Sequence, residues 1–235
     1  MKTILVLGNL PLATKVMKHV LRHPKAKLVG VVVPEEEKEY PSNDGEVCAY
    51  AFAKRKRIPI YKVEDLREKE GFDLAISARN NEILPFWFLG KFNLGVVNCH
   101  GGYLPDYKGV GGHVFPIVNG EEYSGGTIHW MTERVDEGDL IDRLPVDIRP
   151  SDTGYSLFIK INDAIYFLIV KCFEEILTGT APRIPQHRLK PSTQTGVSYF
   201  YFKKDFKELT KKRYLSERER RALYWPGAPI RGGEG

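Results

Sequence analysis

Three absences narrow the classes of protein that this sequence can encode. Its three cysteines, Cys48, Cys99 and Cys172, lie far apart without a C-x-x-C pair, so the sequence suggests neither a zinc site nor a disulfide framework. No apolar run approaches the roughly 20 residues that span a bilayer. The stretch from Met1 to Gly8 runs into a strand-and-turn pattern without a signal-peptide cleavage region, so we expect the first strand of a cytoplasmic protein.

A dinucleotide-binding loop is also missing. The turn after the first expected strand, Gly8-Asn9-Leu10-Pro11, carries no G-x-G-x-x-G motif. The same turn precedes an expected helix, and the exposed N–H groups at a helix N-terminus can bind a phosphate. A phosphate contact therefore stays open at this turn, whereas a dinucleotide site is not indicated.

Composition is ordinary for a soluble globular protein. Of the 235 residues, 42% are apolar and 28% are charged, and the length suits one large domain with a small appendage. The formal net charge is +5, and residues 203–221 hold nine Lys or Arg against four acids. This basic segment fits either a solvated helical surface or an anionic partner, such as a nucleotide diphosphate or RNA.

Strand and helix patterns alternate through the first hundred residues. Such an alternation predicts a parallel sheet with helices on both faces. The expected strands are 4–8, 27–33, 58–61, 73–77 and 94–97, the expected helices are 12–22, 46–57, 64–69 and 83–89, and a polar loop is expected at 34–45.

The rest of the chain continues this pattern and then changes near residue 182. Further strands are expected at 125–131 and 140–148, and helices at 113–119 and 153–177, the last of them capped by Ser151-Asp152. We place a domain boundary at the change, with a main domain at 1–182 and an appendage at 183–235. The appendage is expected to hold a β-hairpin at 183–202, a short helix at 216–223 and a frayed end at 230–235. The predicted fold class is α/β, a mostly parallel sheet with a small C-terminal hairpin-and-helix appendage.

Polar side chains follow the expected strand at 94–97, where an open α/β sheet binds its ligands. Asn98 and His100 precede a glycine-rich loop, and Asp136 lies in a second loop at a strand end. If neighbouring strands carry the two loops, the three side chains converge. They suit acyl transfer to an amine, in which His100 takes a proton, the Asn98 amide donates to the oxyanion and Asp136 orients the imidazole. The alternative is a turn residue, a loop histidine and a strand-end cap.

Cys99 lies between Asn98 and His100, which raises the question of a nucleophilic thiol. Neighbouring residues of a strand point to opposite faces. If Asn98 and His100 face the cleft, Cys99 faces the core, where a buried cysteine behaves as a small hydrophobe.

Four segments, taken in order, resemble the signature of the folate-dependent formyltransferases. They are Asn98-x-His100, Leu104-Pro105-x-Tyr107-Lys108-Gly109, Gly126-Thr127-Ile128-His129 and Val135-Asp136-x-Gly138. The resemblance covers residues 1–178 and implies a Rossmann-like catalytic domain at 1–182. The family includes glycinamide ribonucleotide, methionyl-tRNA and sugar N-formyltransferases. One departure is Lys108, where relatives usually have Arg; lysine keeps the charge but not the planar fork.

This resemblance implies 10-formyltetrahydrofolate as the formyl donor, with no metal. It implies that Asn98, His100 and Asp136 are the catalytic trio. It also places the folate between two segments, whose candidate contacts are Glu82, Ile83, Leu84, Thr132, Glu133 and Val135. Core packing is the alternative for the apolar pair Ile83 and Leu84, and both can hold because the pocket needs only their backbone groups.

Within the family, the sequence looks most like the sugar N-formyltransferases. The chain is too short for the additional C-terminal barrel of the transfer-RNA enzymes, and the aromatic residues late in the appendage look like the nucleotide-sugar branch. This implies a dTDP- or UDP-linked amino sugar as acceptor, a place in O-antigen or lipopolysaccharide biosynthesis, and a homodimer formed through the appendage. Candidate diphosphate contacts are Asn9, Arg79 and Lys108, with a turn residue, a surface cation and a loop-packing residue as their alternatives.

Other functions stay open at this point. A glycinamide ribonucleotide formyltransferase or a formyltetrahydrofolate hydrolase belongs to the same family. A metal-binding α/β protein would use the three histidines at 100, 113 and 129 with Asp136, but their spacing shows no H-x-x-x-H or H-x-H pairing. An RNA-binding module would depend only on the basic segment, so nucleic acid is an unlikely partner.

Overall fold

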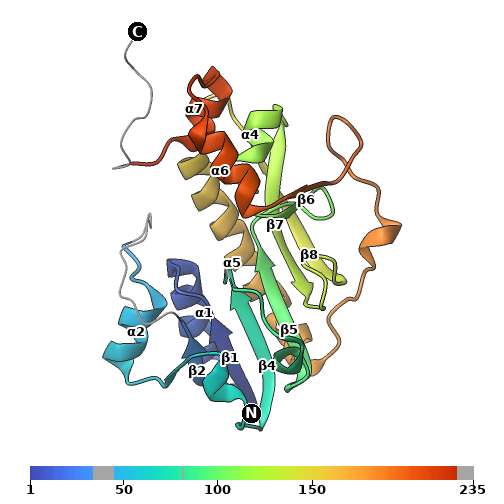
Figure 1. Ribbon diagram of the computed structural model, residues 1–235. Coiled ribbons are helices and arrows are strands. Elements are labelled where there is room, and N and C mark those ends of the chain that lie inside the picture. The colour runs from blue at the N-terminus through green and yellow to red at the C-terminus, as the bar shows by residue number, and fades with distance from the viewer. Residues whose placement is uncertain (34–44, 81, 227–235) are drawn as a thin grey trace.

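Figure 1 shows the computed structural model, which describes residues 1–33, 45–80 and 82–226. Apart from Gly45, the polar loop predicted at 34–45 lies outside the described residues, as does the frayed end predicted at 230–235.

A seven-stranded sheet forms the centre of the molecule, in the order β3-β2-β1-β4-β5-β7-β8. Its strands are β1 (Lys2–Leu7), β2 (Ala26–Val32), β3 (Ile60–Tyr61), β4 (Phe72–Ala78), β5 (Phe92–His100), β7 (Tyr123–Trp130) and β8 (Leu140–Asp147). The first five strands pair in parallel, whereas β7 runs antiparallel to β5 and β8 antiparallel to β7. The predicted α/β class with a mostly parallel sheet is therefore confirmed.

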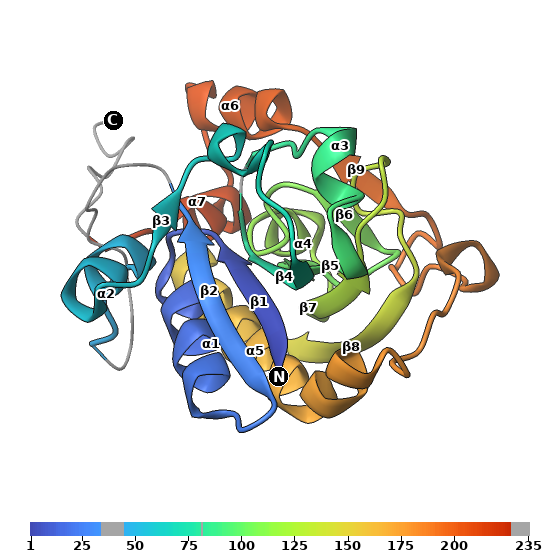
Figure 2. The ribbon, with the colours of Figure 1, turned by 90° about the horizontal axis from the view of Figure 1, so that it is seen from below.

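Helices cover the two faces of the sheet unequally. The helices are α1 (Pro11–Arg22), α2 (Ala49–Lys56), α3 (Phe86–Leu89), α4 (Phe115–Asn119), α5 (Gly154–Thr178), α6 (Lys203–Lys211) and α7 (Glu217–Leu223), with 3-10 turns η1 (Glu64–Leu66) and η2 (Gln186–Arg188). One apolar cluster joins α1 and α5 to one face, and a smaller cluster joins α3 and η1 to the other. Figure 2 shows α1 and α5 side by side, on the opposite side of the sheet from α3.

Helix α5 is the long helix that the sequence predicts, but its cap lies one residue later than expected. The N-cap is Thr153, whose hydroxyl accepts from the amide of Ser156 while the Ser156 hydroxyl accepts from the amide of Thr153. Asp152 supports this box by accepting from the Ser156 hydroxyl at 2.8 Å. The helix ends at Gly179, which has φ +74° and can adopt this left-handed conformation without a Cβ clash.

Four other predicted helices are shorter than expected. The helix predicted at 64–69 is only the 3-10 turn η1, the one at 113–119 is reduced to α4, and α3 and α2 both start late. Residue Pro85 is extended, so α3 begins only at Phe86. The segment before α2 is also extended as far as Cys48, whose Sγ accepts from the amide of Ala51. In both cases an extended residue at the N-cap sets where the helix can start.

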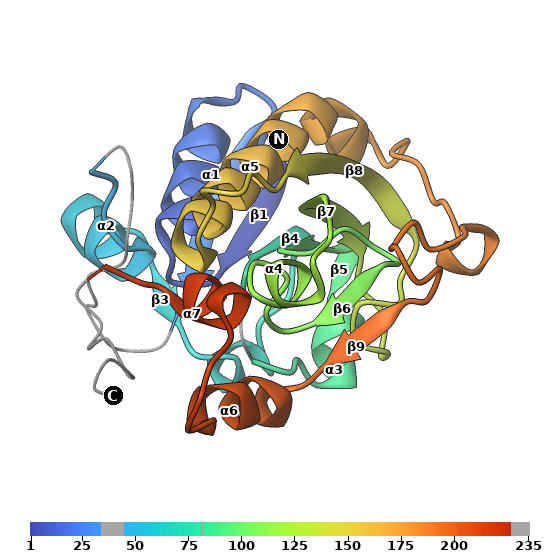
Figure 3. The same ribbon diagram turned by 90° about the horizontal axis from the view of Figure 1, so that it is seen from above.

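The predicted hairpin at 183–202 is wrong. Only β9 (Tyr199–Tyr201) is a strand there, and it pairs in parallel with β6 (Tyr107–Gly109), a strand that the sequence did not predict. Residues 183–198, which we call the strap, run beside β8 as an irregular segment and lead into β9 (Figures 1 and 3). Because β9 finds its hydrogen-bond partner in the loop after β5, it does not need a second strand of its own.

The basic segment folds into α6 and α7, of which only α7 was predicted. Helix α7 contacts α4 and α5, so the end of the chain returns to the main domain (Figure 3). Among the described residues, no helix is long and apolar enough to cross a membrane.

Candidate active site

The three predicted catalytic side chains meet at the end of β5. The Asn98 Nδ2 donates to Asp136 Oδ1 at 3.3 Å, and His100 Nδ1 lies 3.3 Å from Asp136 Oδ2. His100 and Asp136 are 8% and 7% exposed. The three side chains therefore converge, as the sequence predicted for loops carried by neighbouring strands.

The pairing of β5 with β7 explains why the side chains meet. Asn98 lies opposite His129 in the antiparallel register, and the chain then turns from β7 through the loop that carries Asp136. Asp136 has φ +55°, a left-handed conformation that is uncommon for a residue other than glycine. Its Oδ2 accepts from the Gly109 amide at 2.8 Å, which ties the carboxylate to β6.

His129 is a fourth member of this cluster, and sequence reasoning gave it no role in catalysis. Its Nδ1 lies 3.0 Å from the Trp130 carbonyl oxygen, and its Nε2 lies 3.0 Å from Asn98 Nδ2 and 3.6 Å from Asp136 Oδ1. A neutral ring that donates from Nδ1 leaves Nε2 as an acceptor for the Asn98 amide. The sequence signal that could have identified His129 was its place in the segment Gly126-Thr127-Ile128-His129, which resembles the family.

The His100 ring has an oxygen atom against each of its nitrogens. Nε2 lies 2.8 Å from the Tyr107 carbonyl oxygen, opposite the Nδ1 contact with Asp136. Burial lowers the pKa of His100, while the charge of Asp136 and the Tyr107 carbonyl oppose that shift. Both ring nitrogens face an oxygen, and only a protonated ring could donate to both, but burial outweighs these contacts and favours the neutral ring.

Asp136 is held in its ionised form. Burial alone would raise the pKa of its carboxyl, but the charge of His100, the neighbouring His129 ring and the Gly109 amide outweigh burial and lower that pKa to about 2. The site therefore contains a permanent buried anion between two histidines.

Cys99 is not a nucleophile in this geometry. Its side chain is 1% exposed and belongs to the main apolar cluster, and burial raises the pKa of the thiol to about 12. Because the thiolate is the reactive form, a thiol with this pKa stays unreactive near neutral pH. Cys99 therefore faces the core, as the alternation of side chains along a strand predicted.

The residues of the two predicted folate segments differ in how far they are exposed to solvent. Leu84 is 8% exposed and packs in the smaller apolar cluster with Met131, whereas Ile83 is 86% and Val135 46% exposed. The other predicted contacts, Glu82, Thr132 and Glu133, are exposed. Each segment thus presents one apolar side chain to solvent, next to residues anchored in a shared cluster.

The three predicted diphosphate contacts have different surroundings. The Asn9 Oδ1 accepts from the Tyr50 amide at 3.0 Å, which holds the start of α2. The Lys108 Nζ lies 3.3 Å from Glu137 Oε1. Among the described residues, no contact joins Lys108 to Arg79 or to Asn9.

Arg79 is a half-buried cation just beyond the end of β4. Its guanidinium lies over the Phe158 ring at 4.8 Å and donates to Asn162 Oδ1 at 3.4 Å. Although the residue keeps some exposed surface, burial lowers the pKa of the guanidinium to about 10. Within the described ranges, no carboxylate forms an ion pair with Arg79. A desolvated cation without an anion is a favourable partner for a phosphate.

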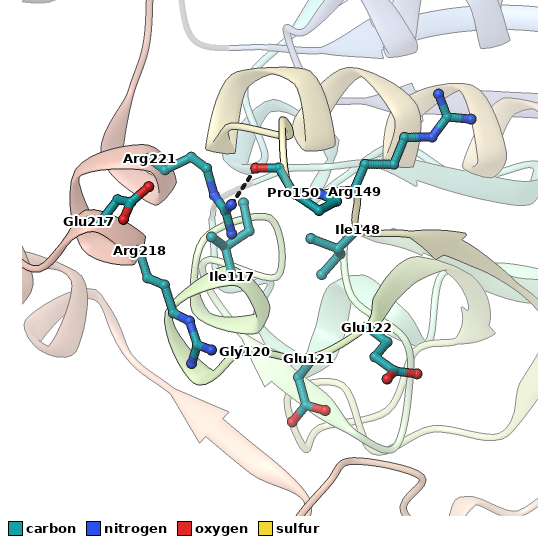
Figure 4. Close-up of a pocket in the computed structure, with 10 residues that line it drawn as sticks. All are labelled: Ile117, Gly120, Glu121, Glu122, Ile148, Arg149, Pro150, Glu217, Arg218 and Arg221. Carbon is teal, nitrogen blue, oxygen red and sulfur yellow. Dashed lines mark hydrogen bonds between the residues drawn. The ribbon is translucent and has the colours of Figure 1, made fainter.

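Two cavities lie outside the trio. One of about 330 Å³ is formed where α4 and the end of β8 meet α7, and its wall includes Arg218 and Arg221, which donates to the Pro150 carbonyl (Figure 4). The other, of about 500 Å³, is lined by Lys108 and Thr132 together with Gln186 and His187 of the strap. Lys108 therefore shares a cavity with a predicted folate residue. In the part of the chain that the structure describes, no group of three or more His, Cys, Asp or Glu side chains is arranged to hold a metal ion.

Comparison with known families gives a match across most of the main domain. A family model described as "Formyl transferase" matches residues 13–172. A methionyl-tRNA formyltransferase from Macrococcus caseolyticus is 35% identical over 149 residues, which is 60% of this chain and 48% of the relative. The chain thus spans about half the length of this curated relative.

Solved structures resemble the chain over more of its length. An N-formyltransferase from Helicobacter canadensis, solved with folinic acid and dTDP-3-aminofucose, is 20% identical with a TM-score of 0.75, and the match covers 96% of this chain and 81% of the other. The formyltransferase PseJ from Anoxybacillus kamchatkensis, solved with UDP-4,6-dideoxy-4-formamido-L-AltNAc and tetrahydrofolate, is 19% identical with a TM-score of 0.61 and 88% coverage of each chain. At these identities the likeness shows a shared fold.

Proposed function

The chain belongs to the formyl transferase family, and from that premise we propose that it transfers a formyl group from 10-formyltetrahydrofolate to the amine of a nucleotide-linked amino-deoxy sugar. The observation that carries the reaction class is the buried cluster of Asn98, His100 and Asp136. The sugar acceptor is supported by the Helicobacter canadensis structure, because its likeness extends over 96% of this chain, well beyond residue 172.

In the proposed reaction, the sugar amine attacks the formyl carbon and the carbonyl oxygen becomes an oxyanion. The Asn98 amide donates to this oxyanion, which lowers the energy of the tetrahedral intermediate. His100 takes the proton that the amine loses, and the Asp136 carboxylate stabilises the resulting imidazolium. The oxyanion then re-forms the carbonyl, the bond to the folate nitrogen breaks as that nitrogen takes the proton from the His100 imidazolium, and the formyl group stays on the sugar.

The ligand-free geometry implies two rearrangements in this proposal. The Asn98 amide hydrogens face Asp136 and His129, so one of these contacts is exchanged for the substrate. The Nε2 atom of His100 faces the Tyr107 carbonyl, so the ring leaves that oxygen before it can accept a proton. Apo geometry of this kind tightens into its productive form only when substrate is bound.

For the nucleotide, we propose Arg79 as the main diphosphate contact. It is a half-buried cation just beyond the end of a parallel strand, the position where open α/β sheets bind ligands. Asn9 and Lys108 remain proposed contacts, although Asn9 also holds α2 and Lys108 lines the cavity that contains Thr132.

For the folate, we propose that the pterin lies between residues 82–84 and the loop at 132–136. The exposed side chains of Ile83 and Val135 would give it apolar contacts, while Leu84 anchors the first segment. The appendage at 183–235 remains proposed as a dimerisation and substrate region, and light scattering of the purified protein would test the dimer.

A second acceptor is favoured by a specific observation. The curated relative with 35% identity is a methionyl-tRNA formyltransferase, so methionyl-tRNA is the first rival to the amino sugar. The basic helices α6 and α7 would then face the RNA.

One assay compares these acceptors. Purified protein is given 10-formyltetrahydrofolate with a panel of dTDP- and UDP-linked amino sugars, with methionyl-tRNA, with glycinamide ribonucleotide, or with no acceptor, and mass spectrometry follows the formyl group. We expect a formylated sugar from the wild type, and a rate lowered by about 10²- to 10⁴-fold in His100→Ala because proton transfer is lost. Asn98→Ala is expected to lose a similar amount.

The other outcomes separate the alternatives. Formylated methionyl-tRNA or glycinamide ribonucleotide would replace the sugar as acceptor, and loss of formyl from folate in every tube would identify a hydrolase. If folate neither binds nor reacts, the reaction class itself is wrong.

A further inference from the structure

The backbone of the Asp136 loop is held by a side chain from outside the segment that matches the family. Gln186 lies in η2 of the strap and is 7% exposed. Its Nε2 donates to the Asp136 carbonyl at 2.7 Å and to the Gly138 carbonyl at 2.8 Å. An amide nitrogen has two hydrogens, so one group can satisfy both carbonyls at once.

The loop needs such a restraint because of its conformation. Asp136 has φ +55°, and its side chain is correct for catalysis only while the carboxylate lies between His100 and His129. The Gly109 amide fixes the carboxylate itself, and Gln186 fixes the main chain that carries it. Strained backbone of this kind persists where surrounding contacts determine it.

The strap places Gln186 by contacts on both sides. Before it, Ile184 exchanges two main-chain hydrogen bonds with Leu140 at 2.9 and 3.0 Å. After it, the Ser192 amide and hydroxyl donate to the Asp106 carboxylate at 3.1 and 2.7 Å. The strap is thereby attached to both loops that surround the trio, one through Gln186 and the other through Asp106.

The oxygen of the Gln186 side-chain amide indicates that packing alone does not explain this residue. Its Oε1 is buried and has no hydrogen-bond partner among the residues that the structure describes. An apolar side chain of similar size would avoid that unsatisfied oxygen, but it could not bind the two carbonyls. An amide side chain at residue 186 therefore indicates that this residue serves to hold the Asp136 loop.

We propose that Gln186 is a positioning residue for the reaction, which it serves by holding the Asp136 loop so that the carboxylate stays against His100. This inference rests on the proposed function, in which His100 and Asp136 act together. In this role Gln186 makes the strap part of the active site, and this function of the strap is separate from dimerisation.

The test compares Gln186→Ala with Gln194→Ala. Gln194 is in the same strap, and its Nε2 donates to the Gly120 carbonyl at 2.7 Å, away from the Asp136 loop. Formyl transfer from 10-formyltetrahydrofolate to the acceptor found in the panel is measured for each variant. We expect a fall in kcat of about 10²-fold for Gln186→Ala, because small misplacements of catalytic groups have effects of that size. KM should match that of Gln194→Ala, and both variants are assayed at a temperature where they are folded, because Gln186→Ala also leaves two buried carbonyls without their donor.

A second readout needs no substrate. The groups that face His100 are Asp136, His129, Arg79 and the Tyr107 carbonyl, and of the charged ones only Asp136 raises its pKa. If Gln186→Ala lets the carboxylate move away, the titration midpoint of His100, followed by NMR of ¹⁵N-labelled histidines, falls to lower pH. The His100→Ala spectrum assigns the signal, and Gln194→Ala should leave the midpoint unchanged.

The outcomes are distinct from those of the proposed function. If the wild type transfers no formyl group but the His100 midpoint still falls in Gln186→Ala, the function fails and the positioning role stands. If rate and midpoint of Gln186→Ala equal those of Gln194→Ala, the inference is overturned. Should Gln186→Ala not fold, Gln186→Met fills a similar volume without a donor and decides: its kcat and its His100 midpoint should both fall below those of Gln194→Ala, whereas equal values would overturn the inference.

Discussion

The parallel part of the sheet and the region around the trio are held together by different interactions. In β1, the four residues from Ile4 to Leu7 are all fully buried and apolar. Around the trio, the buried residues include carboxylates, amides and imidazoles, which bond one another, β6 or the strap: His100, Asp106, Glu121, His129, Asp136 and Gln186. The first region depends on non-directional apolar burial, and the second on hydrogen bonds that require particular geometry.

This difference separates stability from function in the molecule. A change in the parallel part should alter the free energy of unfolding and leave the site chemistry intact. A change around the trio should alter local geometry and titration at a smaller cost to the whole fold. Three measurements test whether the two regions are independent.

The largest effect on stability is expected from Ile76→Ala in β4. Ile76 is fully buried in the main apolar cluster, and truncation there leaves a cavity that should lower the free energy of unfolding by about 2–5 kcal/mol. Urea denaturation gives this value, and kcat at a temperature where the variant is folded should match the wild type. A large fall in kcat for folded Ile76→Ala would show that the two regions are coupled.

The second expected effect is a pH dependence of the free energy of unfolding. The folded-state pKa of Asp136 is about 2, below its ordinary value of 3.8, so the carboxylate stabilises the fold above pH 3.8 and this contribution disappears as the pH falls through about 2. The contribution is worth about 2 kcal/mol. Urea denaturation of wild type and Asp136→Asn should give a difference that shrinks across this window. A difference that stays constant with pH would contradict the ionised, histidine-bound carboxylate.

The smallest effect is expected from Ser192→Ala in the strap. The hydroxyl donates to Asp106 at 2.7 Å, and its loss should lower the free energy of unfolding by at most about 1 kcal/mol. Hydrogen exchange should nevertheless quicken at 190–201 while β1 and β4 stay protected. Equal changes in both regions would mean that the strap unfolds only with the whole molecule.

The features that the sequence could predict follow the same division between the parallel part of the sheet and the region around the trio. Strand–helix alternation predicted the parallel part well, because apolar periodicity directly reflects burial on a sheet face. The meeting of Asn98, His100 and Asp136 was predictable from strand ends and from the family-like segments. Their roles in catalysis remain predictions.

The strap could not be predicted in the same way. Residues 183–202 contain aromatic and β-branched residues that suggested a hairpin, but β9 pairs with β6, far away in the chain. Local patterns give no information about a partner at that separation. Gln186 carried no signal either, since its value depends on two carbonyl groups that the fold brings to it.

The pairing of β6 with β9 also has a consequence for the order in which the protein matures during synthesis. Tyr107 pairs with Tyr199, so this second sheet can form only after most of the chain has left the ribosome. The parallel strands β1 to β5 are complete long before that point, and α5, which covers one of their faces, follows at 154–178. A nascent chain therefore has the elements of its main sheet first and the β6–β9 pairing beside the trio last.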